Sequence, residues 1–391
     1  MIGSAELQVI QATLRVDEGR DASIRETASK QLDWHKVRSL AQHHGVSPLV
    51  YKRLKEVALD LVPPAVMQEM AAFQKANELR VIQMTADLIR VVRALEAENI
   101  PVICLKGPVL AQVLYGDPAM RLFGDLDILV PPDCMHRVEE ILKTIGVKPI
   151  INECHPDEVI TEQELTNDWE RSYLFHNQRH LLEVHWKITD ADFQHAFNID
   201  EIFSSNQGVV LNGHTIKTLN TEDTALYLCY HGTHHCWMKY RYLDDFTSAL
   251  RNIDVSKWEQ LLSSSASRGL RLPLLVTLGL CQYLLGLELP QEVSKNIRYN
   301  WLAHYTTRIA LSYLGRYTTT GPDLLEKQIV NILTSSKPFL NNTLPLLDGM
   351  FVPTDQDFEW VSLPAGLRWL YPLLRPIRRI AKGIGMICSR N

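Results

Sequence analysis

Two aspartates, Asp125 and Asp127, stand at the start of an apolar run, 126–130 (LDILV), that is typical of a buried strand. Residues separated by one position on an extended chain point to the same face, so the two carboxylates would lie side by side. Without a partner they would repel each other, and one would tend to stay protonated. A divalent cation removes this repulsion, and Asp-x-Asp on a rigid strand is one common way to hold Mg²⁺ for phosphate chemistry. By itself the motif fits equally well a strand that begins with two solvated acids.

A second segment, 180–188 (HLLEVHWKI), offers a third carboxylate. Its residues alternate strictly between apolar and polar from Leu182 to Lys187. This period of two predicts a strand with Glu183 on the same face as His185 and Lys187, while the apolar side chains pack on the other side. Alone, the pattern would also fit an edge strand with one wet face. Together with the aspartate pair, Glu183 would give three acids on adjacent strands, which suits a two-metal clamp.

The segments around these acids predict a mixed sheet. Apolar runs alternate with short helical patterns and are followed by two strand-like runs that could form an antiparallel pair. A further hairpin is expected around Asn212-Gly213, because Asn-Gly is the strongest short turn signal. The polar segment 152–170 is predicted to be a loop. The predicted strands are 100–105, 126–130, 147–151, 171–176 and 180–188, and the predicted helices between them are 107–115 and 132–145.

Helical patterns flank this sheet on both sides. A long helix is predicted over 65–98, and a shorter one restarts at Ser47-Pro48, with Ser47 as its N-cap. The chain becomes helical again at Thr221, after Asn220 as the cap, and 272–287 reads as a buried core helix. We therefore predict an α+β fold with an N-terminal helical region (1–97), a mixed-sheet core (98–220), a C-terminal helical region (221–336), and a linker with a basic tail (337–391).

Composition narrows the class of protein. The chain has 391 residues, 46% of them hydrophobic and 22% charged, and a net charge of −5, so no stable complex with nucleic acid is expected. Its seven cysteines are scattered, odd in number and without a C-x-x-C, which argues against a disulfide framework and for a reducing compartment. The first thirty residues lack a signal-peptide core, and the most apolar run is 16 residues, short of a bilayer span. These features predict a cytoplasmic protein without a transmembrane segment.

The C-terminal tail is basic and apolar. No acidic residue follows Glu359, and arginines alternate with leucine, tryptophan and isoleucine. Such a segment could lie on a membrane surface or dock on an acidic partner. The alternative is a C-terminal helix packed on the domain, with its arginines extending to solvent. Pro372 and Pro376 would interrupt any long amphipathic helix, which favours the packed alternative.

The order of these motifs resembles a known family. Lys106-Gly107, Arg121, Gly124–Asp127 and then Glu183–Trp186 follow one another as in the little-characterised nucleotidyltransferases of the DNA polymerase β-like superfamily. The same family has a downstream helix with His-Gly-x-x-His, a basic residue and an aspartate. An N-terminal helix pair over 41–54 and a Leu-Arg-Pro in the tail also fit, so the resemblance covers nearly the whole chain. The downstream positions here are His231, His235, Lys239 and Asp245.

The resemblance implies a polymerase-β-like mixed-sheet core and roles for several residues. Asp125 and Asp127 would bind Mg²⁺ (or Mn²⁺) and the triphosphate, and Glu183 would ligate a second metal and could act as the base toward the acceptor. Four residues upstream of or beside the aspartates would bind the nucleotide: Lys106, Gly107, Arg121 and Gly124. Five further residues are weaker candidates for lining the cleft: His185, His231, His235, Lys239 and Asp245.

The histidine cluster leaves alternatives open. His231 and His235 lie one helical turn apart and could share a zinc ion, but no glutamate stands at the general-base position and no third ligand is evident. They could instead line the cleft or simply pack in the core. Lys239 and Asp245 could equally be an ordinary pair on a helix surface.

The implied activity is Mg²⁺-dependent transfer of a nucleoside monophosphate from a nucleoside triphosphate, such as ATP, to a hydroxyl or phosphate of a small molecule, sugar, peptide or protein, with release of pyrophosphate. One residue departs from the family pattern, because Pro108 follows Gly107 where a serine is usual. Proline lacks both the hydroxyl and the N–H that would bind phosphate. Two rival functions therefore remain, a degenerate nucleotide-binding module and a metal-dependent phosphohydrolase.

Overall fold

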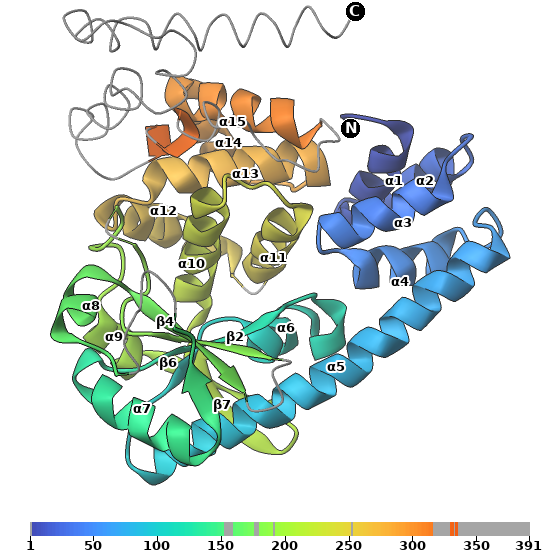
Figure 1. Cartoon of the computed structure of the whole chain (residues 1–391). Coiled ribbons are helices and arrows are strands. Elements are labelled where there is room, and N and C mark those ends of the chain that lie inside the picture. The colour runs from blue at the N-terminus through green and yellow to red at the C-terminus, as the bar shows by residue number, and fades with distance from the viewer. Residues whose placement is uncertain are drawn as a thin grey trace, which may run out of the picture. The chain divides into compact units, whose positions relative to one another are not determined.

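A seven-stranded mixed sheet carries the two aspartates (Figure 1). The strand order is β3-β4-β5-β2-β1-β7-β6, with β2 parallel to β5, β1 parallel to β7, and the other neighbours antiparallel. The α+β class predicted from the sequence is thus confirmed. The strands are β1 (Ile103–Cys104), β2 (Asp125–Leu129), β3 (Val147–Pro149), β4 (Glu170–Phe175), β5 (Leu181–His185), β6 (Asn206–Leu211) and β7 (His214–Leu219).

This computed structural model describes residues 2–151, 159–175, 180–190, 192–251, 253–315, 329–331 and 333–334. They belong to one unit that reaches to Thr334. The predicted linker and basic tail, 337–391, lie outside the described residues. The division of the chain into four regions stays a prediction.

The register of the central strands brings the acids together. On β2 and β5, Asp127 is the direct partner of Glu183, and Asp125 is the partner of Leu181. The antiparallel strand β4 sets Glu170 opposite His185. Because side chains alternate between the two faces, these polar residues share one face of the sheet.

The other face of the sheet is apolar and is covered by helices. Leu182, Val184 and Trp186 are fully buried, as the alternating pattern predicts. They share a core with α5 (Pro64–Ala97) and α7 (Met135–Thr144), which lie beneath the sheet in Figure 1. Burying this face fixes the side to which the acids must point.

Helices also lie over the polar face. Helix α10 (Thr221–His234) and helix α11 (Tyr240–Leu250) stand above the sheet in Figure 1, and α6 (Gly107–Tyr115) follows β1 as predicted. Asn220 caps α10 by accepting a hydrogen bond from the N–H of Asp223, in agreement with the sequence prediction.

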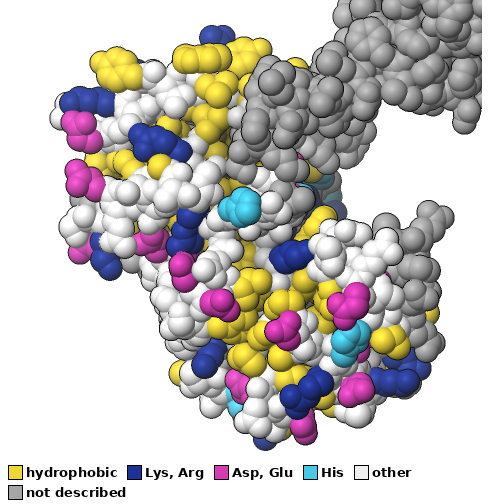
Figure 2. Space-filling model, turned by 90° about the vertical axis from the view of Figure 1, so that its left-hand side faces the viewer, with side chains coloured by type: hydrophobic (Ala, Val, Ile, Leu, Met, Phe, Trp, Pro, Cys, Tyr) yellow, Lys and Arg dark blue, Asp and Glu magenta, His cyan; other side chains and the backbone are white. Residues whose placement is uncertain are grey.

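The remaining helices build a second core around α10 and α11. The buried helix predicted over 272–287 corresponds to α13. No helix in the described part of the chain combines the length and the apolar character that crossing a bilayer requires. In Figure 2, acidic and basic side chains are interspersed over the face shown, as the balanced composition suggests. These helices are α1 (Ala5–Leu14), α2 (Arg20–Ala28), α3 (Trp34–His43), α4 (Ser47–Val57), α12 (Trp258–Ser267), α13 (Arg271–Leu285), α14 (Gln291–Tyr299) and α15 (Trp301–Leu314).

The hairpin predicted at Asn212-Gly213 is confirmed. The two residues join β6 to β7, and both have positive φ angles, 49° for Asn212 and 79° for Gly213. A tight two-residue turn requires this conformation, and asparagine and glycine adopt it most readily.

Two local predictions are wrong. The segment 152–170 is not a continuous loop, because α8 (Glu162–Asn167) forms within it, started by a capping box between Thr161 and Glu164. That signal, Thr-x-x-Glu, was present in the sequence. The N-cap of α4 is Val46, and Ser47 is the first residue of the helix. The hydroxyl of Ser47 is buried without a hydrogen-bond partner among the described residues.

Candidate active site

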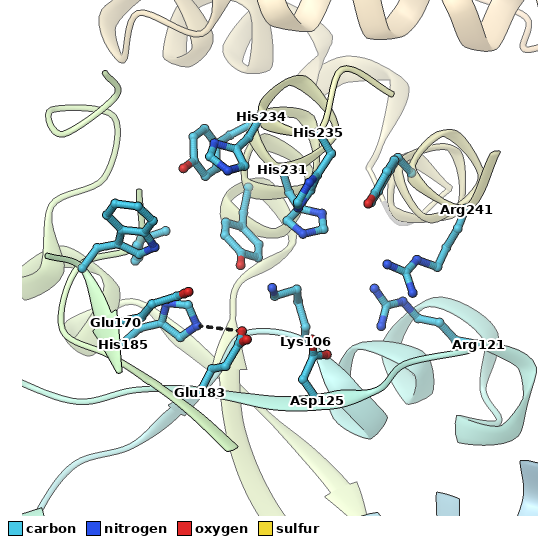
Figure 3. Close-up of a pocket in the computed structure, with 15 residues that line it drawn as sticks. Lys106, Arg121, Asp125, Glu170, Glu183, His185, His231, His234, His235 and Arg241 are labelled. Atoms are coloured by element: carbon cyan, nitrogen blue, oxygen red, sulfur yellow. Dashed lines mark ion pairs between the residues drawn. The ribbon is translucent and has the colours of Figure 1, made fainter. Parts of the chain in front are cut away.

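A cavity of about 330 Å³ lies between the polar face of the sheet and helices α10 and α11. Figure 3 shows carboxylates from the strands at its floor, histidines from α10 above them, and two arginines together on one side. Its polar lining combines both signs of charge, which suits a ligand that carries phosphate groups held by a cation. The principal lining residues are Lys106, Arg121, Asp125, Glu170, Glu183, His185, Tyr227, His231, His234, His235 and Arg241.

Asp127 is the most deeply buried acid of the site, at 1% exposure. Its Oδ1 lies 2.6 Å from the Nζ of Lys106 in an ion pair, and both carboxylate oxygens are buried without a hydrogen-bond partner in the described part of the chain. Burial alone would raise the pKa of Asp127, but the positive charge of Lys106 and the neighbouring ring of His185 hold that pKa well below its usual range. Burial alone would lower the pKa of Lys106, but the negative charge of Asp127 raises it above its usual value. Both groups are therefore ionised at neutral pH.

The neighbouring acids are in the opposite situation. Burial and the charge of Asp127 raise the pKa of Asp125. Burial, together with the charges of Asp127, Glu170 and Asp125, raises the pKa of Glu183 to about 9. Without added positive charge, Glu183 therefore stays protonated in neutral solution.

Glu183→Gln should change how the stability of the metal-free protein depends on pH. Between the unfolded pKa of 4.5 and the folded value of about 9, the folded protein binds a proton that the unfolded chain has released. The contribution of Glu183 to stability therefore falls as pH rises through this window. We expect the melting temperature of Glu183→Gln, measured in EDTA, to match wild type at pH 5 and to exceed it by several degrees at pH 8.

The control is Glu201→Gln, which removes the same charge at an exposed position on α9 (Ile199–Ser204). Its melting temperature should follow that of wild type at both pH values. If Glu183→Gln does the same, Glu183 is ionised in the folded protein and its environment is not as acidic as the geometry indicates.

His185 joins the acids into one cluster. Its Nδ1 lies 3.1 Å from Oε2 of Glu170, and its Nε2 lies 3.4 Å from Oδ1 of Asp127 and 4.0 Å from Oε2 of Glu183. Ligand atoms of Asp127, Glu183 and His185 all lie within 4.8 Å of one another, close enough to share one metal ion. Asp125 lines the cavity beside them but is not part of this set.

Glu170 was missed by the sequence analysis. It lies at the end of a polar segment without periodicity, and only the antiparallel pairing of β4 with β5 places it opposite His185. Nothing in the local sequence sets that register, so no local signal could have identified it.

Arg121 is nearly fully buried and is held by α11. Its Nε donates a hydrogen bond of 2.9 Å to Oδ2 of Asp245. The hydroxyl of Tyr115 lies 2.8 Å from the other oxygen of Asp245 and 2.6 Å from Asp244. Arg121 lines the cavity, where Figure 3 shows its guanidinium beside that of Arg241. Asp245 does not line the cavity itself but fixes the orientation of the arginine that does.

The basic residue of α11 that lines the cavity is Arg241, which the sequence analysis missed in favour of Lys239. Arg241 donates a hydrogen bond of 2.7 Å through Nη1 to the carbonyl oxygen of Leu122. Lys239 instead lines a separate pocket. The two residues are two positions apart at the start of α11, so only the direction of the helix distinguishes them.

His231 and His235 both line the cavity. Burial, and then the charges of Lys106 and His235, lower the pKa of His231 well below its usual value, so it is neutral at physiological pH. The two imidazole rings are in edge contact, with 4.7 Å between their centroids. The ring of His235 also stacks on the ring of Tyr242, with 5.2 Å between those centroids. Among the described residues, no third ligand joins these two histidines in a metal-binding group, which disfavours the zinc alternative.

The two glycines predicted to bind nucleotide do not line the cavity. Gly107 begins α6 with a positive φ of 64° and is buried, so a side chain there would be strained. Pro108, the departure from the family pattern, is buried with it. Gly124 is exposed and lines the separate pocket with Lys239. Their contact with a nucleotide stays a prediction.

A sequence model of one protein family, described as uncharacterised nucleotidyltransferase, matches residues 30–286. The matched segment includes every residue of the cavity named above. Among curated proteins, none matches the chain.

Two solved structures of the protein ANT(2″)-Ia match about half of the chain. One is a solution structure of this antibiotic-resistance factor, with 16% identity and a TM-score of 0.36, over 48% of this chain and 93% of that chain. The other is a crystal structure in complex with adenylyl-2″-tobramycin, with 16% identity and a TM-score of 0.35, over 48% of this chain and 97% of that chain. At these TM-scores the likeness is too distant to transfer a function.

Proposed function

We propose that this chain, which belongs to the family of uncharacterised nucleotidyltransferases, transfers a nucleoside monophosphate from a nucleoside triphosphate, such as ATP, to another molecule. The family model covers well over half of the chain, which shows the membership. The acceptor group would be a hydroxyl or a phosphate on a small molecule, a peptide or a protein. Pyrophosphate would be the second product.

The observation that supports this function most strongly is the pairing of Asp127 with Glu183 on adjacent strands. In this pair Glu183 lines the cavity, as does Asp125 on the same face, while Asp127 is buried beside them. Such carboxylates are typical of sites where divalent cations assist the transfer of phosphoryl groups.

The proposed chemistry implies a divalent cation, Mg²⁺ or Mn²⁺, and the residues present fit one. Asp127, Glu183 and His185 offer three converging ligand atoms, and Oδ2 of Asp127 is buried without a hydrogen bond from the described residues. Oxygen ligands suit Mg²⁺, while the imidazole also suits Mn²⁺. Asp125 is the next ligand available on this face. When bound, the cation would offset negative charge on the attacking and leaving oxygens.

The basic side of the cavity would bind the triphosphate. Lys106, Arg121 and Arg241 all face the space above the carboxylates. Arg121 has its Nε engaged by Asp245, which leaves the outer nitrogens of the guanidinium to bind phosphate oxygens. Lys106 would supply a point charge close to Asp127. These three residues would take over the binding of phosphate from the serine hydroxyl and N–H, both of which Pro108 lacks.

The balance of the reaction is simple. The acceptor oxygen forms a bond to the α-phosphorus of the nucleotide, and the bond from that phosphorus to the oxygen bridging the β-phosphate breaks. A hydroxyl acceptor also loses a proton, for which Glu183 is the candidate base. Glu183 can accept it only when ionised, which requires positive charge beside it to offset its acidic neighbours.

Product analysis with labelled nucleotides tests this proposal. Each nucleoside triphosphate, labelled separately at the α- and γ-phosphates, would be incubated with the protein, MgCl₂ and a fraction of cellular small molecules and peptides. We expect the γ-label to appear in pyrophosphate and the α-label to become attached to an acceptor.

The same experiment separates the rival functions. A phosphohydrolase would release inorganic phosphate or a free nucleoside monophosphate and label no acceptor. A degenerate module would bind nucleotide and leave both labels in the triphosphate. Either pattern contradicts the proposed transfer.

A further inference from the structure

A second cavity, of about 410 Å³, lies on the other side of the loop that leads into β2. The chain from Leu122 to Gly124 forms its wall, whereas Arg121 and Asp125, at the two ends of this loop, line the active-site cavity. Arg241 lines both cavities and donates its hydrogen bond to Leu122 in the wall between them. The second cavity is therefore adjacent to the carboxylates and shares one arginine with them.

The side chains of this second cavity are basic. Arg80 from α5, Lys239 at the start of α11, and Arg241 all line it. Among the residues that the structure describes, no acidic side chain forms a direct ion pair with any of these three, and the nearest acid that acts on the two arginines is Asp125 of the first cavity. Burial, and then the charge of Arg241, lower the pKa of Lys239, as expected for a partly buried cation close to another cation.

Arg80 and Arg241 are held in place by hydrogen bonds to neutral groups and not by direct ion pairs with acids. Arg80 donates to the carbonyl oxygen of Phe123 and to Oδ1 of Asn77, and its guanidinium lies over the ring of Phe123. Nε of Arg241 is buried and has no hydrogen-bond partner within the described part of the chain. Both arginines are thus anchored by neutral groups and keep their charge available. Partly buried cations without a direct ion pair are costly unless an anion binds them.

We propose that this second cavity binds a phosphate group of a substrate beside the catalytic carboxylates. Two arginines and a lysine match the charge and the hydrogen-bond geometry of phosphate. The apolar walls, Phe73 and Phe123, suit the organic part of the same molecule. The phosphate belongs either to the nucleotide or to a phosphorylated acceptor.

Binding of inorganic pyrophosphate to the full chain in EDTA tests the site directly. The first cavity also carries cations, so the binding site is assigned by variants of Lys239 and Arg80, which line the second cavity and not the first. We expect saturable binding by wild type, measured by isothermal titration calorimetry, and a loss of about tenfold or more in affinity for Lys239→Gln. Arg80→Gln should show the same loss. The matched control is Lys143→Gln, an exposed lysine of α7, which should bind within about twofold of wild type.

Kinetics of Lys239→Gln then distinguish the two sources of the phosphate, and this part rests on the proposed function. A raised KM for the nucleoside triphosphate assigns the site to the nucleotide, and a raised KM for the acceptor alone assigns it to the acceptor. The inference is overturned if wild type shows no saturable binding, if both variants bind like Lys143→Gln, or if neither KM changes. Should the protein show no transfer at all, the calorimetry still decides on the site, so the two proposals fail separately.

Discussion

Asp127→Asn is expected to lower the rate of nucleotidyl transfer by roughly three orders of magnitude or more, or about 4 kcal/mol of activation free energy. Asp127 offers the site's most deeply buried carboxylate, and neither of its oxygens has a hydrogen-bond partner in the described chain. An amide cannot supply the charge that a divalent cation requires. The measurement is the initial rate with saturating nucleotide and MgCl₂.

The same substitution should also destabilise the protein. The pKa of Asp127 is held below its usual range, so its charge contributes stability at every pH above the unfolded pKa. Replacing it leaves Lys106 buried without its partner, which typically costs about 3–5 kcal/mol. We expect a melting temperature several degrees below that of wild type at pH 7.

Asp125→Asn is the matched comparison. Like Asp127→Asn it should lose activity, but unlike Asp127→Asn it should not lose stability. The pKa of Asp125 is raised by burial and by Asp127, so its charge costs stability at neutral pH. We expect this variant to lose activity as well, with a melting temperature equal to or above that of wild type. Full activity in either variant would contradict the assignment of the aspartates.

Arg121→Lys is expected to raise KM for the nucleotide about tenfold or more, consistent with a lost charge-assisted hydrogen bond of roughly 1.5–3 kcal/mol. Arg121 uses Nε to bind Asp245 and presents its remaining nitrogens to the cavity. An ammonium group cannot keep the contact with Asp245 and also bind two phosphate oxygens in a fixed plane. The measurement is a titration of nucleotide at fixed acceptor.

The control for Arg121→Lys is Arg25→Lys. Arg25 forms a two-pronged pair with Asp60, with both contacts at 2.8 Å, on an exposed surface far from the cavity. Its substitution should leave KM unchanged. If Arg121→Lys also leaves KM and kcat unchanged, Arg121 has only a structural role and other groups bind the triphosphate.

Much of the fold could be predicted because its signals are local. The alternation from Leu182 to Lys187 gave the face of Glu183, and Asn212-Gly213 gave the hairpin. The two-residue separation of the aspartates placed both on that same face. Each of these inferences depends only on the geometry of an extended strand or a tight turn.

The rest of the site depends on contacts between distant segments. Arg121 is oriented by Asp245, which follows it by 124 residues. Glu170 reaches His185 only through strand pairing, and the pairing of Lys106 with Asp127 requires β1 and β2 to be neighbours. No pattern within a single segment encodes these contacts. The same holds for Lys239 and Arg241, which both line the second cavity, because a loop from another part of the chain separates it from the first cavity, which only Arg241 of the two also lines.

We propose that the carboxylates of β2 and β5 perform metal-dependent nucleotidyl transfer. The most direct test is mass spectrometry of the acceptor fraction after incubation with nucleoside triphosphate, comparing wild type in MgCl₂, wild type in EDTA, and Asp127→Asn in MgCl₂. We expect a product heavier by one nucleoside monophosphate in the first sample and in neither of the others. The same product from Asp127→Asn or from the EDTA sample, or its absence from all three while the nucleotide is hydrolysed, would contradict it.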